Sequence, residues 1–406
     1  MAKPAPISWT VNWPQATFLF VTPCIALWAT SHIELQLRTF IWAFIYYFVT
    51  GLGITAGYHR LWAHKSYDAV LPYQIWMALA GVGAVEGSIR WWSRGHRAHH
   101  RYTDTDKDPY NAHRGLFWAH IGWMLVKPSD DKRAALGRVE MQDLDRDSIV
   151  KFQHKYYVPL ALFMAFAFPS LIAGLGWGDW VGGFFYAGVA RLVCVHHATF
   201  CVNSLAHYLG EATYDDIRSP RDHWVTALAT FGEGMHNFHH EFPNDYRNAV
   251  LWHQYDPTKW LIYVCSVFGL TYNLKQFPSN EVIKGKLLMS EKKNVTIRHS
   301  LDWGIDVADL PVWDRERYTE ELKLNPAMLV IDGVAHDVSL FIQDHPGGVG
   351  FIRAYMGQKD ATAAFNGGVY KHATAARNLM TRLRVARVEG MTSSAASASS
   401  APSPIL

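Results

Sequence analysis

Histidines in three short segments are the residues of this sequence best suited to chemistry. His96, His99 and His100 stand at i, i+3 and i+4 in HRAHH, a spacing that places three imidazoles on one face of a helix. The same spacing recurs in HNFHH, and GYHRLWAH supplies a further pair, which adds His236, His239, His240, His59 and His64. Neutral imidazole is a common nitrogen ligand of zinc, iron and copper. The spacing therefore predicts that the three segments converge on a metal site.

The number of histidines indicates two metal ions. Eight imidazoles exceed the roughly four ligands that one zinc ion takes, and the H-E-x-x-H pattern of zinc hydrolases is absent from the sequence. Iron suits an imidazole-rich site that carries out oxygen chemistry. His59 and His64 are separated by about 140° on a regular helix, so they can share a site only if the helix ends or bends there. His207, one helical turn after Asn203, is a further candidate ligand.

Apolar segments between the histidine motifs predict membrane anchoring. Half of the 406 residues are hydrophobic and 14% are aromatic, yet mean hydropathy is near zero, so apolar spans embedded in polar regions are expected. A membrane-spanning helix needs about 20 apolar residues, and four spans are expected at about 16–31, 39–57, 157–176 and 180–203. They form two hairpins, which places every histidine motif on one side of the membrane. Basic residues gather on that side, so the positive-inside tendency predicts that it is cytoplasmic.

Other features narrow the class of protein. Leu71–Val85 is expected to be an interfacial or core helix, and Leu261–Leu270 is too short to span. The N-terminus lacks a cleavable-signal pattern, and the net charge of +3 gives no argument for nucleic acid. The cysteines form no C-x-x-C pair, which argues against a disulfide scaffold and for a reducing compartment; they are Cys24, Cys194, Cys201 and Cys265.

The motifs GYHRLWAH, HRAHH, NSLAH and HNFHH, in this order around two apolar hairpins, closely resemble those of the membrane-bound stearoyl-CoA (Δ9 acyl-CoA) desaturases. The resemblance covers roughly residues 13–260, and RYTDTDKDPY together with the C-terminal fusion is similar to the fungal branch. It implies a di-iron centre that uses O2 and two electrons to introduce a cis double bond between C9 and C10 of a saturated acyl-CoA. The implied iron ligands are His59, His64, His96, His99, His100, His207, His236, His239 and His240, with Asn203 reaching one iron through water.

The same resemblance implies residues that contact the substrate. Arg94 and Lys127 fall at CoA-contacting positions, and Trp92 falls near the entrance of the acyl tunnel. Three tryptophans are candidates for the wall of a bent tunnel or, equally, for packing: Trp91, Trp92 and Trp118.

The sequence also departs from the family pattern. Animal members carry an acidic residue at the position of Gly95, so the CoA contacts here can be rearranged. His196 and His197 lie in the fourth expected span, where the family has no ligands. We interpret them as tunnel-lining or hydrogen-bonded residues rather than as a further metal site.

Two further histidines indicate a second cofactor. QDHPGG contains His345, and YKHATAA contains His372, 27 residues later. With VIDGVAHDVSLF upstream, these motifs resemble the cytochrome b5 domain over about Leu310–Val388. The resemblance implies a b-type haem with His345 and His372 as axial ligands, whereas His336 is not a ligand on this pattern. A haem with both axial positions filled has no open site for O2 and carries single electrons.

The expected fold is mainly α: a four-span membrane desaturase domain with a cytosolic histidine cap over residues 1–275, followed by a linker over 276–309. A small α+β cytochrome b5-like domain at 310–388 and a disordered tail at 389–406 complete the chain. The resemblance implies residence in the endoplasmic reticulum membrane, an acyl-CoA substrate, and an NADH-cytochrome b5 reductase as the source of electrons. Two alternatives stay open. One is a fatty-acyl hydroxylase or a desaturase of other regiochemistry, and the other is a haem and metal protein that carries electrons or acts as a sensor.

Overall fold

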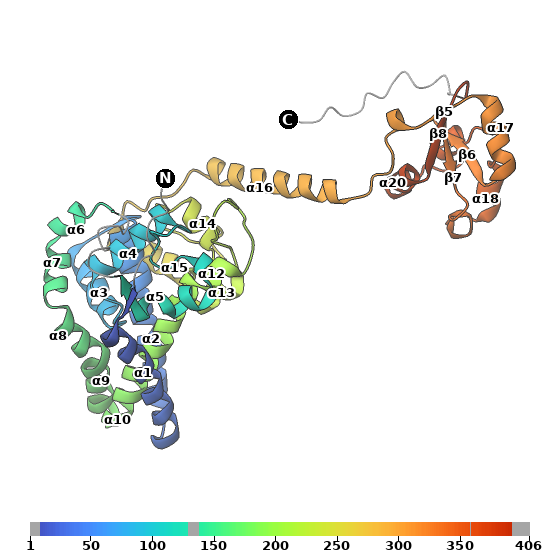
Figure 1. The fold of residues 1–406 in the computed structure, drawn as a ribbon. Helices are drawn as coiled ribbons and strands as arrows, with labels where there is room; N and C mark the ends of the chain where they lie inside the picture. Colours follow the sequence, from blue (N-terminus) through green and yellow to red (C-terminus); the bar gives the residue numbers. More distant parts are fainter. Residues whose placement is uncertain (1–8, 129–137, 358, 392–406) are drawn as a thin grey trace. The chain divides into compact units, whose positions relative to one another are not determined.

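The computed structural model describes residues 9–128, 138–357 and 359–391 (Figure 1). It divides into two compact units, residues 1–292 and 293–406. The expected tail at 389–406 lies almost wholly outside the described residues.

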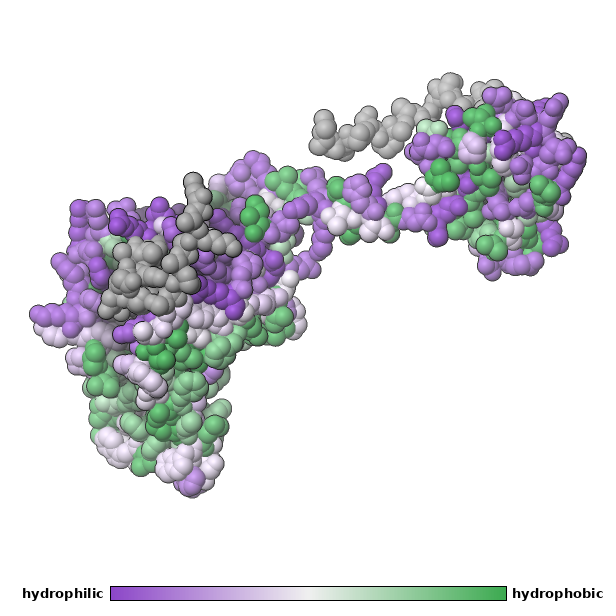
Figure 2. All heavy atoms as spheres, viewed as in Figure 1, coloured by the Kyte–Doolittle hydropathy of each residue, from purple (hydrophilic) through white to green (hydrophobic). Residues whose placement is uncertain are grey.

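Long apolar helices form one part of the first unit, and Figure 2 shows their surface as hydrophobic where Figure 1 labels α1, α2, α9 and α10. Apolar side chains are favourable there because lipid, not water, surrounds such a surface. Within the long helices, π-helical segments directly follow α-helical ones; the label η marks π-helical and 3-10 segments alike. They are α1 (Trp13–His32), α2 (Leu37–Leu52), η1 (Gly53–Ala63), α8 (Tyr157–Leu162), η5 (Phe163–Ala167), α9 (Phe168–Trp177), α10 (Trp180–Gly182), η6 (Gly183–Ala190), α11 (Arg191–Asn203) and α12 (Leu205–Tyr208).

Three helices in the described chain are long and apolar enough to cross a membrane: Leu37–Ala63, Tyr157–Trp177 and Trp180–Tyr208. They contain three of the four spans expected from the sequence. The fourth, about residues 16–31, lies in α1, which has the necessary 20 residues but not the hydropathy. Pro23 stands inside α1, and Gln15, Thr17 and Thr22 lower its apolar character, so a four-span topology is not confirmed.

The remainder of the first unit is a polar cap built from short helices and two small strand pairs. Its helices are α3 (Leu71–Val82), α4 (Ile89–Tyr102), η2 (Ala112–Arg114), η3 (Trp118–Gly122), α5 (Trp123–Leu125), α6 (Gln142–Arg146), α7 (Ser148–Lys155), α13 (Trp224–Ala229), α14 (His236–Glu241) and α15 (Pro257–Val267). Two antiparallel pairs tie distant segments together: β1 (Trp9–Val11) with β3 (Val126–Pro128), and β2 (Asp68–Ala69) with β4 (Thr271–Tyr272).

Close packing of α3 against η1 fixes the end of the membrane helix. A Cβ atom on Gly53 would lie 2.3 Å from the backbone nitrogen of Gly81, so only glycine allows the two backbones to approach this closely. Tyr58 and Met77, from the two elements, are fully buried in the main core together with Ile262 of α15. One face of Leu71–Val82 thus packs in the core, while Leu71, Ile75 and Trp76 are exposed on the other, so both alternatives expected for this stretch, an interfacial or a core helix, stay open.

The second unit is built around a four-stranded sheet of order β5-β8-β7-β6, in which only β5 and β8 are parallel. Along β6, Met328 and Val330 face one apolar cluster and Leu329 and Ile331 face another. Side chains of a strand alternate between faces, so both faces of this sheet are covered. The elements are β5 (Val312–Trp313), α17 (Arg315–Leu324), β6 (Met328–Ile331), β7 (Val334–Asp337), α18 (Val349–Ala354), α19 (Thr362–Phe365), α20 (Thr374–Arg382), β8 (Arg384–Val388) and the short 3-10 turns η7 (Val307–Asp309) and η8 (Ile342–Asp344).

The segment expected to be a linker contains one long helix, α16 (Ser279–Ser300). Near its start Val282 is buried in a cluster with Phe238 and Phe242 of the first unit. The division between the two units falls inside this helix, after Lys292.

Candidate metal centre

A widened turn at the end of a membrane helix brings His59 and His64 together. The backbone N–H of His64 donates to the carbonyl oxygen of His59 at 3.0 Å, which is the i to i+5 bond of a π-helix. More residues per turn bring positions five apart closer in angle, and the two ring centroids are 4.8 Å apart. The helix ends at Ala63 with His64 as its cap residue, as the sharing of one site required, and its last turns are π-helical.

Capped helices carry the two histidine triplets. The Ser88 side chain accepts a hydrogen bond from the backbone N–H of Trp91 and starts α4. The short helix α14 is held by Asp222, whose Oδ1 accepts from the backbone N–H groups of Asn237 and Phe238 at 2.9 and 3.1 Å. Without such partners these N–H groups at the helix start would be unsatisfied.

Nine histidines form two neighbouring groups in which one ring nitrogen of each residue lies within 4.8 Å of the others. The i and i+4 members of each triplet enter one group, and the i+3 member enters the other. One group contains His59, His64, His96, His100 and His239, and the other contains His99, His207, His236 and His240. Both triplets thus contribute to both groups, which couples the geometry of the two sites.

The ring nitrogens of these groups are arranged as metal ligands. Five pairs of Nε2 atoms lie 2.7–3.2 Å apart, and they join His59–His239, His64–His96, His100–His239, His99–His240 and His236–His240. Two nitrogens bound to one metal ion at about 2.1 Å lie about 3 Å from each other. The Nε2 atom of His207 is buried and has no hydrogen-bond partner. The residues present therefore fit two metal ions.

Burial favours the neutral form, which is the form that binds metal, for several of these imidazoles. Burial and then the charges of neighbouring groups lower the pKa well below its usual value for His64, His96, His100, His239 and His240. For His236 the same causes lower the pKa to about 3.

A cavity of about 750 Å³ opens beside both groups and is bordered by His59, His96, His99 and His236. Asn203, at the end of α11, borders the same cavity. The cavity has mostly apolar walls, so it can hold a hydrocarbon chain next to the histidines.

The two remaining histidine candidates face each other in the second unit. The ring centroids of His345 and His372 are 6.3 Å apart. Their Nδ1 atoms lie 3.1 and 3.0 Å from the backbone carbonyl oxygens of Gly348 and Phe365. These contacts assign the proton to Nδ1 and leave each Nε2 lone pair free, which fits two axial ligands of one haem. His336 lies in β7 and is buried apart from this pair.

Comparison with known proteins agrees with both sites. The family model for fatty acid desaturases matches residues 37–273, and that for the cytochrome b5-like haem/steroid binding domain matches residues 314–389. The chain is 53% identical to a probable acyl-CoA desaturase of Schizosaccharomyces pombe, over 94% of this chain and 78% of that protein. It is 46% identical to acyl-CoA desaturase 1 of Saccharomyces cerevisiae, over 95% and 75%.

The chain belongs to the fatty acid desaturase family. A Delta(9)-fatty-acid desaturase of Caenorhabditis elegans is 41% identical over 60% of this chain and 72% of that protein. The protein is thus a membrane oxidoreductase of lipid metabolism with its own haem-binding electron-transfer domain.

Buried carboxylates accept hydrogen bonds from the Nδ1 atoms of two of the grouped histidines, the ring nitrogens that point away from the metal groups. His59 Nδ1 lies 3.1 Å from Glu233 Oε2, and His99 Nδ1 lies 2.9 Å from Asp108 Oδ1. His207 Nδ1 lies 2.7 Å from the Ser219 hydroxyl. In each case the outer nitrogen donates, which turns Nε2 toward the metal groups and makes it a better ligand.

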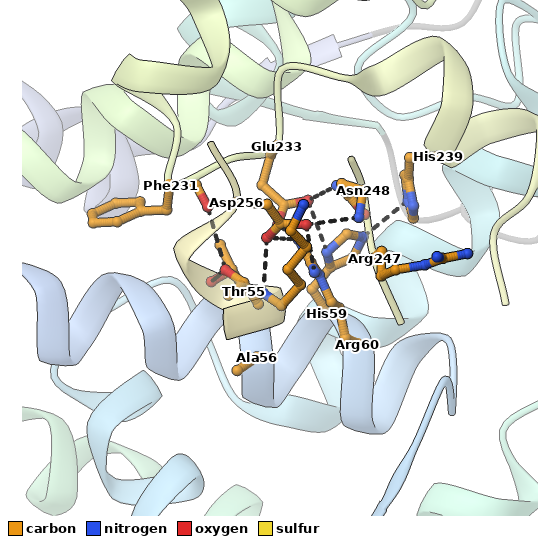
Figure 3. A network of polar contacts seen from close by, with 12 residues as sticks. Thr55, Ala56, His59, Arg60, Phe231, Glu233, His239, Arg247, Asn248 and Asp256 are labelled. Atoms are coloured by element: carbon orange, nitrogen blue, oxygen red, sulfur yellow. Dashed lines mark hydrogen bonds and ion pairs between the residues drawn. The ribbon is translucent and has the colours of Figure 1, made fainter. Parts of the chain in front are cut away.

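Glu233 is part of a larger network, which Figure 3 shows around His59 and Arg60. The Arg60 guanidinium donates to Glu233 at 2.8 Å and to both carboxylate oxygens of Asp256 at 2.9 and 3.1 Å. Asn248 donates to Glu233 from the other side. Burial alone would raise the pKa of Glu233, but Arg60 and His59 lower it to about 2. The carboxylate is therefore charged and fixed in place.

The residues predicted to contact the substrate separate into two sets. Trp91, Trp92, Arg94 and Lys127 border the cavity. Trp118 is not among its described lining residues and instead packs against Trp9, with ring centroids 5.3 Å apart.

The two histidines of the last span have separate partners. His196 borders the cavity, and its Nε2 lies 2.8 Å from the carbonyl oxygen of Ala84. His197 Nδ1 lies 3.1 Å from His120 Nε2. Both are hydrogen-bonded, and neither belongs to the two metal groups found among the described residues.

Sequence reasoning missed the outer partners of the histidines. Asp108 lies inside a motif that was noticed, RYTDTDKDPY, but nothing in its spacing to His99 marks it as a partner. Glu233, three residues before His236, binds His59 of another segment. Only the fold brings these pairs together.

Proposed function

We propose that this protein is an O2-dependent acyl-CoA Δ9 desaturase that introduces a cis double bond between C9 and C10 of palmitoyl- or stearoyl-CoA. The observation that carries the proposal is the apolar cavity bordered by histidines of both metal-binding groups. The Delta(9) activity named for the relative from Caenorhabditis elegans supports the position of the double bond.

The ligands of a di-iron centre would be the nine grouped histidines, and Asn203 would reach one iron through water. An unactivated methylene offers no acidic proton or electrophilic carbon, so acid–base groups alone cannot attack it. Iron ions held there would supply an oxidant made from O2. The chain's own part is to hold the acyl chain still, exclude water and turn the nine imidazoles toward the metal.

Residues along the cavity support binding of an acyl-CoA. Exposed Arg94 and Lys127 would attract the phosphates of CoA, because cations bind such anions. Inside, the Trp92 indole donates to Glu86 at 3.1 Å, and the Thr199 hydroxyl donates to the same carboxyl group at 2.7 Å. These bonds fix the Trp92 ring against His96, with ring centroids 5.0 Å apart. The substrate would pass this fixed ring on its way to the iron ions.

Electrons would enter through a b-type haem held by His345 and His372, reduced by an NADH-cytochrome b5 reductase. Fusion of the haem domain to the desaturase domain raises the effective concentration of the electron donor at the iron ions. We further propose the domain boundaries 1–275, 276–309, 310–388 and 389–406, and a four-span arrangement in which α1 is the first span. In this arrangement the catalytic cap and the haem domain face the cytosol from the endoplasmic reticulum membrane.

Expression in a cell that lacks its own Δ9 desaturase tests the proposal, with fatty-acid analysis that locates each new double bond. The expected result is monounsaturated C16 and C18 chains with the bond at C9. His99→Ala is expected to abolish this product and leave the haem spectrum intact, whereas the matched control His253→Ala changes an exposed histidine outside both groups. Hydroxylated chains, or no product from protein loaded with iron and haem, would overturn the proposal.

A further inference from the structure

A second cavity lies along α1, next to the cavity of the metal centre. Its volume is about 1050 Å³, and its lining comes from α1 and from two candidate membrane spans, through α8, η5, α9 and η6. It is open to the outside of the protein: Trp13 and Leu162, on opposite walls, are 71% and 58% exposed. We call this cavity the membrane groove.

The lining of the membrane groove excludes a polar ligand. Its described lining residues include no charged side chain and are mostly aliphatic or aromatic, such as Val21, Ile25, Phe166 and Phe184. Its hydroxyl groups are few: that of Thr22 already donates to the carbonyl oxygen of Phe18 at 2.8 Å, and that of Ser170 is buried without a hydrogen-bond partner. A headgroup or a CoA moiety would lose its water there and find too few partners to replace it, whereas a hydrocarbon chain would lose nothing. The groove therefore suits an alkyl chain.

Phe18 borders both the membrane groove and the cavity of the metal centre. Along α1, Gln15 and Leu19 face the metal-centre cavity, and Val21 and Ile25 face the groove. Phe18, Val21 and Ile25 are spaced i, i+3 and i+7, so they follow one face of the helix. The groove thus continues the line of the active cavity along α1, with the Phe18 ring between them.

The opposite wall shows the same continuity. His196 borders the metal-centre cavity, and Val189, seven residues earlier, borders the groove. The ring centroids of Phe18 and His196 are 6.0 Å apart. The two rings therefore separate the two cavities. A hydrogen bond to the carbonyl oxygen of Ala84 fixes the His196 ring, whereas only packing holds the Phe18 ring.

We propose that the membrane groove binds the acyl chain of the acyl-CoA, and that the chain passes between the active cavity and the bilayer beside the Phe18 side chain. This inference rests on the proposed function, because it requires an acyl chain in the metal-centre cavity. It gives the end of the acyl chain, which stays attached to CoA, a place beside the lipid that does not expose it to water.

Photo-labelling with a stearoyl-CoA that carries a diazirine near the end of its acyl chain tests this route. The full-length holoprotein in lipid nanodiscs is irradiated, and labelled residues are mapped by mass spectrometry. Labels are expected on Leu19 in the metal-centre cavity and on Val21, Ile25 or Phe166 in the groove. Phe18→Trp is expected to lower groove labelling at least threefold relative to labelling of Leu19, and Phe18→Ala is expected to raise it.

Phe20→Trp is the matched control, because Phe20 is also on α1, is 58% exposed and borders neither cavity. Labelling confined to the metal-centre cavity would overturn the inference and leave the proposed function standing. So would groove labelling that is the same in the parent, Phe18→Trp and Phe18→Ala proteins, since the label would then come from the surrounding lipid. Labelling of neither cavity would count against the proposed function itself. Iron and haem contents equal to those of the parent establish that each variant is folded.

Discussion

Replacement of Glu233 by glutamine is expected to weaken one metal site without removing a ligand. The two carboxylate oxygens serve different donors: Oε1 accepts from Arg60 at 2.8 Å, and Oε2 accepts from His59 Nδ1 at 3.1 Å and from Asn248. An amide has only one oxygen, so its NH2 group must face one of these sets of donors. In both orientations His59 loses a charged partner: it faces an NH2 group, or it keeps only a neutral amide oxygen while Arg60 faces the NH2 group.

The size of the effect follows from that geometry. A buried donor left without an acceptor costs about 1–3 kcal/mol. Loss of an outer partner of a metal ligand lowers metal affinity by about 10- to 100-fold, which equals about 1.4–2.8 kcal/mol at about 1.4 kcal/mol for each factor of ten. The two values agree, so Glu233→Gln is expected to weaken iron binding at the group containing His59 by one to two orders of magnitude.

Titration of the iron-free protein with Fe²⁺ against a chromophoric chelator measures this affinity. Asp108→Asn is expected to weaken the other group, because Asp108 holds His99. Asp245→Asn is the matched control: this buried carboxylate pairs with Arg247 at 2.8 Å and contacts no histidine. Equal affinity of the parent and Glu233→Gln proteins for both iron ions would refute the reasoning.

Three further predictions concern other parts of the molecule. His345→Ala should abolish the b-type haem spectrum while iron still binds, which absorbance and iron analysis check together. Burial raises the pKa of Glu86 to about 7, although the hydrogen bonds from Thr199 and Trp92 lower it. No cation among the described residues pairs with this carboxyl group. Its proton is retained on folding but lost from the unfolded chain above about pH 4.5, so stability should fall by up to about 3 kcal/mol as pH rises from about 4.5 to about 7. Glu86→Gln should remove this part of the pH dependence of the unfolding midpoint. Arg191 donates to the carbonyl oxygens of Gly83, the residue after α3, and of Ala165 in η5 at 2.7 and 3.0 Å. Arg191→Met should therefore cost about 2–6 kcal/mol, at about 1–3 kcal/mol for each buried acceptor left unsatisfied; an unchanged thermal midpoint would contradict this.

The sequence predicted which histidines lie together because their signal is mostly local. The triplets at His96–His100 and His236–His240 carry it in the spacing alone, and three imidazoles on one helix face point to one place. How a triplet is divided between two groups could not be predicted. That division depends on which nitrogens the facing helix presents, and only the packing of α4 against η1 and α14 determines this.

Features that depart from regular helix geometry or regular hydrophobic patterns could not be predicted from the sequence either. A period of 3.6 residues is assumed for any apolar helix, so the π-helical turn from His59 to His64 could not be inferred from side chains. The helix α16 was missed because its charges show no apolar stripe, and only Val282 along its described length is buried. The membrane assignment of α1 stayed unresolved for a related reason: its length suits a span, while Pro23 and several polar residues do not.

The π-helical turn in η1 also changes which mutations the metal centre can tolerate. Within Gly53–Ala63 the relative direction of His59 and His64 is set by the number of residues between them, not by which residues they are. Conservative substitutions of Leu61 or Ala63 should therefore preserve the site if they still pack. Removal of a single residue between His59 and His64 would rotate one imidazole about the helix axis relative to the other by the angle of one residue. In a comparison of natural or engineered variants, this segment should accept changes of residue type far more readily than changes of length.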